Sequence, residues 1–290
     1  MNLLVVVSLL ASFPVGLYIF AGKKITWTGI EDMISRYRYH FFILISVGLM
    51  KSAMFYLEKP VETLWAINLT PMIHEFEGNR IFWFQHLLEN SGMTVFMAII
   101  YVFGFLFIMV FTLILFSYLD MKRVASRMMH LYLVVFLLMV PFYLFVIVYT
   151  PSYPKMFYPG ANSIITGMQP LLYNYGPNVN DFFMNYDTFN NCFPSLHIGY
   201  PAAIAMLIFL DVKGFKRYKA FLLVMLFLIA VAIIYLGIHW LTDIIGGLFI
   251  AIISVIITDR YAYGFWKRVN RCHNLGLKWW NHNIKKKQND

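Results

Sequence analysis

Apolar residues in this chain come in long runs that alternate with short polar segments. Each run has roughly 17–25 residues, the length of a helix that crosses a bilayer. The runs cover residues 2–21, 41–57, 93–118, 130–150, 197–212, 218–235 and 239–258. This pattern predicts an all-α fold, a polytopic transmembrane helical bundle with about seven spans. The second run is short and contains Lys51, so it is the weakest of the set.

The first run also has to be compared with a secretory signal peptide. It lacks a basic start and a clear small-residue cleavage site, so we expect an uncleaved span. The sequence contains no repeats and no low-complexity linkers. We expect it to have three parts. These are a first span with its loop (1–40), a six-helix membrane domain (41–262) and a basic tail (263–290).

The charge distribution predicts the orientation of the bundle. Only 13% of residues are charged and 60% are apolar, yet the formal net charge is +9. Segments 22–40, 119–129, 213–219 and 259–290 hold 19 of the 23 Lys and Arg residues, and they alternate with connections that are poor in Lys and Arg. The positive-inside rule then places the N-terminus outside and the C-terminus in the cytoplasm of a multi-pass cell-membrane protein. The charge therefore indicates contact with anionic membrane lipids and no nucleic acid partner.

Two long segments fall on the outer side in this arrangement. Segment 58–92 has the apolar spacing of a helix in the interface, with Trp65 and Trp83 at typical positions. Segment 151–196 is aromatic and nearly uncharged, which favours a lid or substrate wall. His74 and His86, in the first segment, are interpreted as interfacial residues.

The two cysteines, Cys192 and Cys272, lie on opposite predicted sides of the membrane. An intramolecular disulfide is therefore not expected. With no CxxC pair, the sequence supports neither a redox centre nor a cysteine-built zinc site.

The string Pro194-Ser195-Leu196-His197 stands where the fifth run begins. Because proline fits the first turn of a helix, the string predicts a helix start at this point. A helix start offers free N–H groups and a positive dipole end, which attract phosphate, and the Ser195 hydroxyl adds a donor. His197 could then protonate a leaving oxygen. The alternative is an ordinary helix start with an interfacial histidine.

The second string runs from Tyr235 to Asp243, between the sixth and seventh runs. Gly237 suits the end of a helix, and the next helix is expected to begin near Ile238. His239 and Asp243 are then four residues apart on one helix face. The carboxylate can hold one ring nitrogen and leave the other as a nucleophile. The alternative is a polar helix start with Asp243 placed favourably against the dipole.

Both strings fall on the outer face, so their histidines can cooperate. This order and spacing of residues resembles the type 2 phosphatidic acid phosphatase (lipid phosphate phosphatase) superfamily, and within it the inositol phosphorylceramide synthase-like branch. The resemblance implies that His197 is the general acid, His239 the nucleophile and Asp243 its orienter. It also implies that Ser195 binds a phosphate oxygen.

The sequence departs from the usual pattern of that superfamily in three motifs. Leu196 replaces a glycine, as is familiar from the synthase-like branch. Ala232 and Ile233 stand where a Ser-Arg pair is usual, so a phosphate-binding arginine is missing, and the first motif is also absent in its usual form. A transferred phosphoryl group needs cationic neutralisation. We therefore expect Lys155 to bind the phosphate, with Arg80 as the alternative cation.

These observations predict a membrane enzyme that hydrolyses or transfers a lipid phosphate or diphosphate through a phosphohistidine at the outer face. No cofactor or metal is expected, because the motifs contain a nucleophile and an acid but no carboxylate cluster for Mg²⁺. The alternatives are a non-catalytic scaffold on the same fold, which the missing arginine favours, and a transporter. Against a transporter, no run carries a ladder of polar residues.

Overall fold

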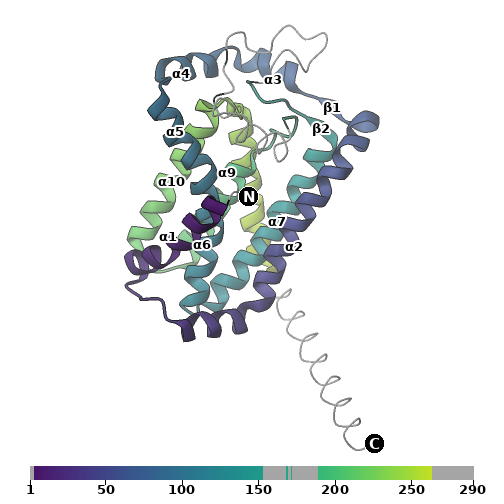
Figure 1. Ribbon diagram of the computed structural model, residues 1–290. Coiled ribbons are helices and arrows are strands. Elements are labelled where there is room, and N and C mark those ends of the chain that lie inside the picture. The colour runs from purple at the N-terminus through teal and green to yellow at the C-terminus, as the bar shows by residue number, and fades with distance from the viewer. Residues whose placement is uncertain (1–2, 153–167, 169–170, 172–188, 263–290) are drawn as a thin grey trace, which may run out of the picture.

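The computed structural model describes residues 3–152, 168, 171 and 189–262. This part of the chain is a bundle of helices with one small pair of strands (Figure 1). In chain order the helices are α1 (Leu3–Ala21), α2 (Trp27–Trp65), α3 (Thr70–Glu77), α4 (Arg80–Leu88), α5 (Ser91–Ile99), α6 (Phe105–Tyr118), α7 (Lys122–Phe145), α9 (Leu196–Asp211), α10 (Lys216–Tyr235) and a final helix, Leu241–Ala262. A π-helical segment, η1 (Ile100–Gly104), joins α5 to α6 without a break.

Four helices of the described chain are long and apolar enough to cross a membrane. They are Ser91–Tyr118, Lys122–Phe145, Lys216–Tyr235 and Leu241–Ala262. Two shorter apolar helices, Ala11–Ala21 and Leu196–Asp211, accompany them. The prediction of a helical membrane protein is thus confirmed, whereas the number of seven spans and their orientation stay predictions.

The outside of the bundle is apolar in the way a lipid environment requires. On the final helix, an exposed stripe of large apolar side chains recurs every three or four residues. It consists of Leu241, Ile245, Phe249, Ile252 and Ile256. In water such a continuous stripe would be unfavourable, so its exposure supports contact with lipid tails.

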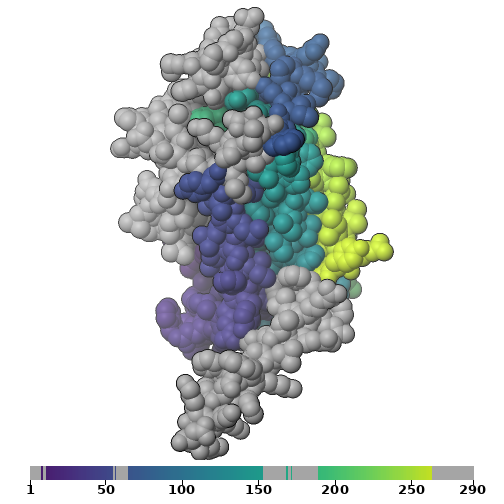
Figure 2. All heavy atoms as spheres, turned by 90° about the vertical axis from the view of Figure 1, so that its right-hand side faces the viewer, coloured from purple at the N-terminus to yellow at the C-terminus, as the bar shows by residue number. Residues whose placement is uncertain are grey.

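The helix α2 extends far beyond the predicted run at 41–57. It begins at Trp27 because the Thr26 hydroxyl accepts a hydrogen bond from the Gly29 N–H and caps the first turn. The helix then packs along α7 over much of its length, as Figures 1 and 2 both show. Its polar first half was not predicted as helix, since it lacks an apolar run.

Segment 58–92 was expected to form a helix in the interface. Instead it contains the end of α2, the strand β1 (Ile67–Asn68) and the two short helices α3 and α4, which Gly78 separates. The strand pairs in parallel with β2 (Val146–Ile147), directly after α7. This pairing fastens the segment to the same end of the bundle as the start of α9, where Val148 bridges to Asn191.

The opposite end of the bundle is held by two ion pairs of the buried residue Arg127. Arg127 of α7 contacts Asp211 at the end of α9 (2.6 Å) and Asp259 of the final helix (2.7 Å). His130 also lies 3.3 Å from the Thr258 hydroxyl. These contacts join three helices. Figure 2 shows two of them, α7 and the final helix, side by side.

Candidate active site

The site begins at the N-terminus of α9. The helix starts at Leu196, with Ser195 as its N-cap in an extended conformation, so the prediction that Pro194 lies in the first helical turn is wrong. The reason is tertiary: the Ser195 N–H donates to the Asp243 carbonyl (3.1 Å), and the Pro194 carbonyl accepts from the Tyr143 hydroxyl (3.0 Å). These bonds keep the chain extended up to Ser195.

The second half of the site is the turn between α10 and the final helix. Gly237 has φ +73°, which confirms the expected left-handed residue at the end of α10. The final helix begins at Leu241, so the expectation that it starts near Ile238 is wrong. The N–H groups of Ile238 and His239 both turn back to the Ile233 carbonyl, and this delays the helix.

His239 and Asp243 nevertheless make the expected contact. His239 Nδ1 lies 3.1 Å from Asp243 Oδ2, and the same oxygen accepts the Trp240 N–H at 2.8 Å. The second bond is half of a capping box, with the helix's third residue reaching back to its N-cap. An ionised Asp243 therefore places the imidazole proton on Nδ1 and leaves the lone pair on Nε2.

The structure brings the two predicted histidines together. The ring centroids of His197 and His239 are 5.9 Å apart, although the residues come from different elements. The His197 ring also contacts two aromatic rings. Its centroid lies 4.4 Å from that of Tyr101 and 4.6 Å from that of Phe105. Tyr101 lies in η1 and Phe105 is the first residue of α6. Both were missed because they fall inside the apolar run 93–118, whose pattern does not tell which of its aromatic side chains face the site.

Ser195 lies beside the pair with an unused donor. Its side chain is fully buried, and among the described residues its Oγ has no hydrogen-bond partner. The final helix approaches very closely here, because a Cβ at Gly247 would lie only 2.7 Å from the Ser195 carbonyl oxygen. Buried hydroxyls are normally paired, so the free Oγ is suited to a ligand.

Glu77 is a further buried residue that the sequence did not single out. Its carboxylate accepts hydrogen bonds from the N–H groups of Leu241 (3.0 Å) and Thr242 (2.6 Å), and also from the Thr242 hydroxyl. Thus α3 supplies the cap for the helix that carries Asp243. Contacts across 165 positions leave no local signal by which Glu77 could have been found.

Of the two predicted phosphate-binding cations, the structure describes only Arg80. Lys155 lies outside the described residues. Arg80 is exposed, and its Nη1 donates to the carbonyls of Phe76 (3.1 Å) and Glu77 (3.0 Å) at the end of α3. Among the described residues, no contact joins Arg80 to either site histidine.

Lys51 of α2 is a further cation, and it contacts a residue that is hydrogen-bonded to Pro194. Lys51 Nζ lies 4.8 Å from the centre of the Tyr143 ring, and Tyr143 in turn holds the Pro194 carbonyl. The sequence analysis considered Lys51 only as a charge that weakens the prediction of a span over residues 41–57.

The remaining polar residues of interest have other surroundings. His74 lies 6.0 Å from the Trp240 ring, and His86 stacks on Phe82 at 5.8 Å. Cys192 is buried, with Sγ 3.4 Å from the Ile238 carbonyl. Cys272 lies outside the described residues.

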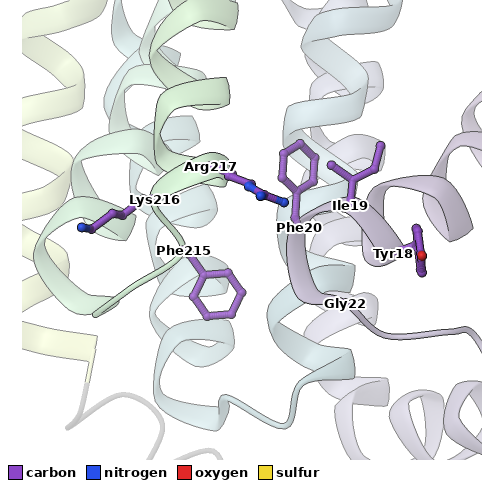
Figure 3. Close-up of a pocket in the computed structure, with 7 residues that line it drawn as sticks. All are labelled: Tyr18, Ile19, Phe20, Gly22, Phe215, Lys216 and Arg217. Carbon is purple, nitrogen blue, oxygen red and sulfur yellow. The ribbon is translucent and has the colours of Figure 1, made fainter.

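Figure 3 shows a pocket between the end of α1 and the start of α10. Its volume is about 700 Å³, and it is lined by Tyr18, Ile19, Phe20, Gly22, Phe215, Lys216 and Arg217. It sits where α10 begins, whereas the histidine turn follows the end of that helix. A 20-residue helix is about 30 Å long, so this pocket is separate from the site.

The geometry defines a helical membrane protein with a buried His–Asp pair facing a second histidine. A family profile described as the PAP2 superfamily matches residues 73–257, more than half of the chain. The chain therefore belongs to the PAP2 superfamily. Its members are generally phosphatases or phosphotransferases, which supports an enzyme of this type. Comparison with curated proteins found no match, and comparison with solved structures found none either.

Proposed function

We propose that this protein is an integral membrane lipid phosphatase or phosphotransferase that works through a phosphohistidine at the outer membrane face. The observation that carries the proposal is the approach of His197 to the His239–Asp243 pair, with ring centroids 5.9 Å apart. Two rings at this separation can contact one phosphoryl group from two sides. The reaction is a transfer of phosphate from a lipid phosphate or diphosphate.

His239 acts as the nucleophile in this proposal. Its Nε2 lone pair attacks phosphorus, so that a nitrogen–phosphorus bond forms while the bond to the lipid oxygen breaks. Asp243 holds the Nδ1 proton and stabilises the positive charge that develops on the ring. Because Asp243 is fixed by the Trp240 N–H as well, the ring needs no reorientation.

His197 supplies the proton for the leaving oxygen. In the second half of the reaction it takes a proton from water or from an alcohol, whose oxygen then attacks the phosphohistidine. Tyr101 and Phe105 restrict the ring of His197 to the orientation that faces His239. Water as acceptor gives hydrolysis, and a lipid or sugar hydroxyl gives transfer.

Phosphate oxygens are bound by the start of α9 and by cations in this proposal. The unpartnered Ser195 Oγ donates to one oxygen, next to the positive end of the helix dipole. Lys155 and Arg80 remain the proposed cations. The nearest branch by motif is the inositol phosphorylceramide synthase-like one, and the lipid is proposed to contact segment 160–191.

The central test is a panel of lipid phosphates and diphosphates incubated with purified protein in detergent and EDTA. Free phosphate and transferred product are both measured. We expect turnover of at least one substrate, and its loss in His239→Ala. Full activity of His239→Ala would disprove the assigned nucleophile.

The acid role of His197 has a separate test. An aryl phosphate has a good leaving group that needs little protonation, whereas an alkyl phosphate depends on the acid. His197→Ala should therefore lose much more activity on alkyl than on aryl phosphates. Equal losses on both would contradict the acid role.

The phosphate-binding cation is tested by charge reversal. Lys155→Glu should impair turnover far more than Lys59→Glu, a matched change in the other outer segment. Arg80→Glu is compared in the same assay. Equal effects of the two lysine variants would indicate general surface electrostatics instead of a specific contact.

A further inference from the structure

Cys192 lies beside the proposed nucleophile and has no role in the proposed reaction. The Cys192 N–H donates to the carbonyl of Val148, which follows α7 and β2 (3.1 Å). This bond holds Cys192 against the turn that follows α10. The Cys192 Sγ, a ring nitrogen of His239 and a carboxylate oxygen of Asp243 all lie within 4.8 Å of one another. The three side chains come from two segments that are far apart in the sequence, so no spacing motif marks them.

We propose that Cys192, His239 and Asp243 form a zinc-binding site. Ligands at zinc–sulfur and zinc–nitrogen or zinc–oxygen distances are about 3.3–3.8 Å apart in a tetrahedron, so side-chain movements of about 1 Å are sufficient. Three protein ligands leave a fourth position open to water or phosphate. The residues are 3%, 5% and 0% exposed, which shields the site from bulk water.

A second observation also points to a ligand at this place. Asp243 Oδ1 is buried, and it has no hydrogen-bond partner among the described residues. A carboxylate oxygen in such surroundings loses hydration without compensation. A dication supplies that compensation, and with a thiolate and a carboxylate as ligands the filled site has no net charge.

The donor set selects zinc over the common hard cations. Mg²⁺ and Ca²⁺ prefer shells made of oxygen ligands, and they bind thiolates poorly. Zn²⁺ accepts sulfur, nitrogen and oxygen together. We therefore expect binding of Zn²⁺ and of its spectroscopic substitute Co²⁺, with no competition from Mg²⁺.

Zinc at this site is inhibitory, and this part of the inference rests on the proposed function. A neutral imidazole has one lone pair. If zinc takes Nδ1, the proton moves to Nε2, and if zinc takes Nε2, the lone pair itself is occupied. In both cases His239 has no lone pair left with which to attack phosphorus.

The binding test uses the full-length, metal-stripped protein in detergent. Co²⁺ addition should produce a sulfur-to-cobalt charge-transfer absorption in the wild type and in the control Cys272→Ser, and Zn²⁺ should remove it. Cys192→Ser should lack this band and bind Zn²⁺ at least tenfold more weakly. An equal affinity in Cys192→Ser, or no binding by the wild type, would overturn the site.

The activity test follows on the substrate found in the lipid panel. Zn²⁺ should inhibit the wild type and Cys272→Ser, and EDTA should restore turnover. Cys192→Ser should keep its basal activity and need at least tenfold more Zn²⁺ for the same inhibition. Zinc binding with unchanged turnover would overturn the inhibitory effect. If no lipid phosphate is turned over without zinc, the proposed function fails, and the binding test alone decides the site.

Discussion

Asp243 is the residue on which the contacts of the site converge. Its Oδ2 accepts from His239 and Trp240, and its carbonyl accepts from the Ser195 N–H. One residue thus orients the proposed nucleophile, caps its own helix and fixes the N-cap of α9.

The change Asp243→Asn tests the orienting role. One oxygen, Oδ2, serves both Trp240 and His239. An amide that turns its NH₂ group to this position loses the Trp240 bond and forces the ring proton onto Nε2, whereas an amide that keeps its oxygen there lacks the negative charge that stabilises the ring. We expect kcat on a lipid phosphate to fall about 10³–10⁴-fold, as for other His–Asp pairs with a reversed tautomer.

The matched control for this change is Asp259→Asn. Asp259 lies on the same helix and contacts Arg127, far from the histidines. Its activity should stay within about twofold of the wild type, because a partly exposed ion pair contributes little. Comparable losses in both variants would argue against an orienting role for Asp243.

Local sequence was informative about which residues gather at the site, because ionisable groups in apolar runs are few. Ser195, His197, His239 and Asp243 were all singled out, and the structure places them together. The helix starts at both strings were each misplaced by a few residues. For α9 the cause is hydrogen bonds with other elements, which no local pattern reveals, and for the final helix it is the turn that closes α10 on the Ile233 carbonyl.

At the scale of elements, the cap that Glu77 provides is the main link between α3 and the site. Glu77→Ala would remove the acceptor that caps the N–H groups of Leu241 and Thr242, and loss of a helix cap costs about 0.5–2 kcal/mol. We expect a lower thermal midpoint in detergent. Glu75→Ala, an exposed change on the same helix, should alter stability by less than about 0.5 kcal/mol. Equal midpoints for the two variants would contradict the capping role.

The turn after α10 can be tested through its glycine. Gly237→Ala faces a positive φ, and the added Cβ would lie 2.8 Å from the Ser152 Cβ. Gly214→Ala has a similar φ of +78° but no neighbour within 4 Å. We expect both changes to lower unfolding free energy by about 1 kcal/mol from backbone strain.

Only Gly237→Ala should also lose stability through the steric contact with Ser152 and lose turnover, because its turn carries His239. Thermal unfolding and turnover of both variants measure the difference. If Gly214→Ala reduces turnover as much as Gly237→Ala does, backbone strain alone accounts for the effect.

The elements themselves were predictable where apolar runs are long and uniform. The runs at 93–118 and 218–235 became helices with similar ends, because burial and lipid contact both favour apolar side chains there. The strands β1 and β2 were not predicted, since two residues each carry too little periodicity. The first half of α2 was missed because helices with charged faces resemble loops in hydropathy.

At the scale of the whole molecule, orientation in the membrane is the main prediction. Basic segments predict an external N-terminus and a cytoplasmic C-terminus. In intact cells, a protease should remove an N-terminal tag, whereas a C-terminal tag should become accessible only after permeabilisation. The reverse pattern would place the histidines on the cytoplasmic side and contradict the proposed location of the reaction.

The absence of a side chain at Gly247 has a consequence for how tightly the reaction centre is specified. At this point, backbone rests on backbone, so the separation between α9 and the final helix does not depend on how flexible side chains happen to pack. Thermal repacking of the apolar interior, or exchange of one lipid environment for another, leaves that spacing unchanged. Substitutions on the lipid-facing surface are therefore expected to leave the close approach of these two helices in place.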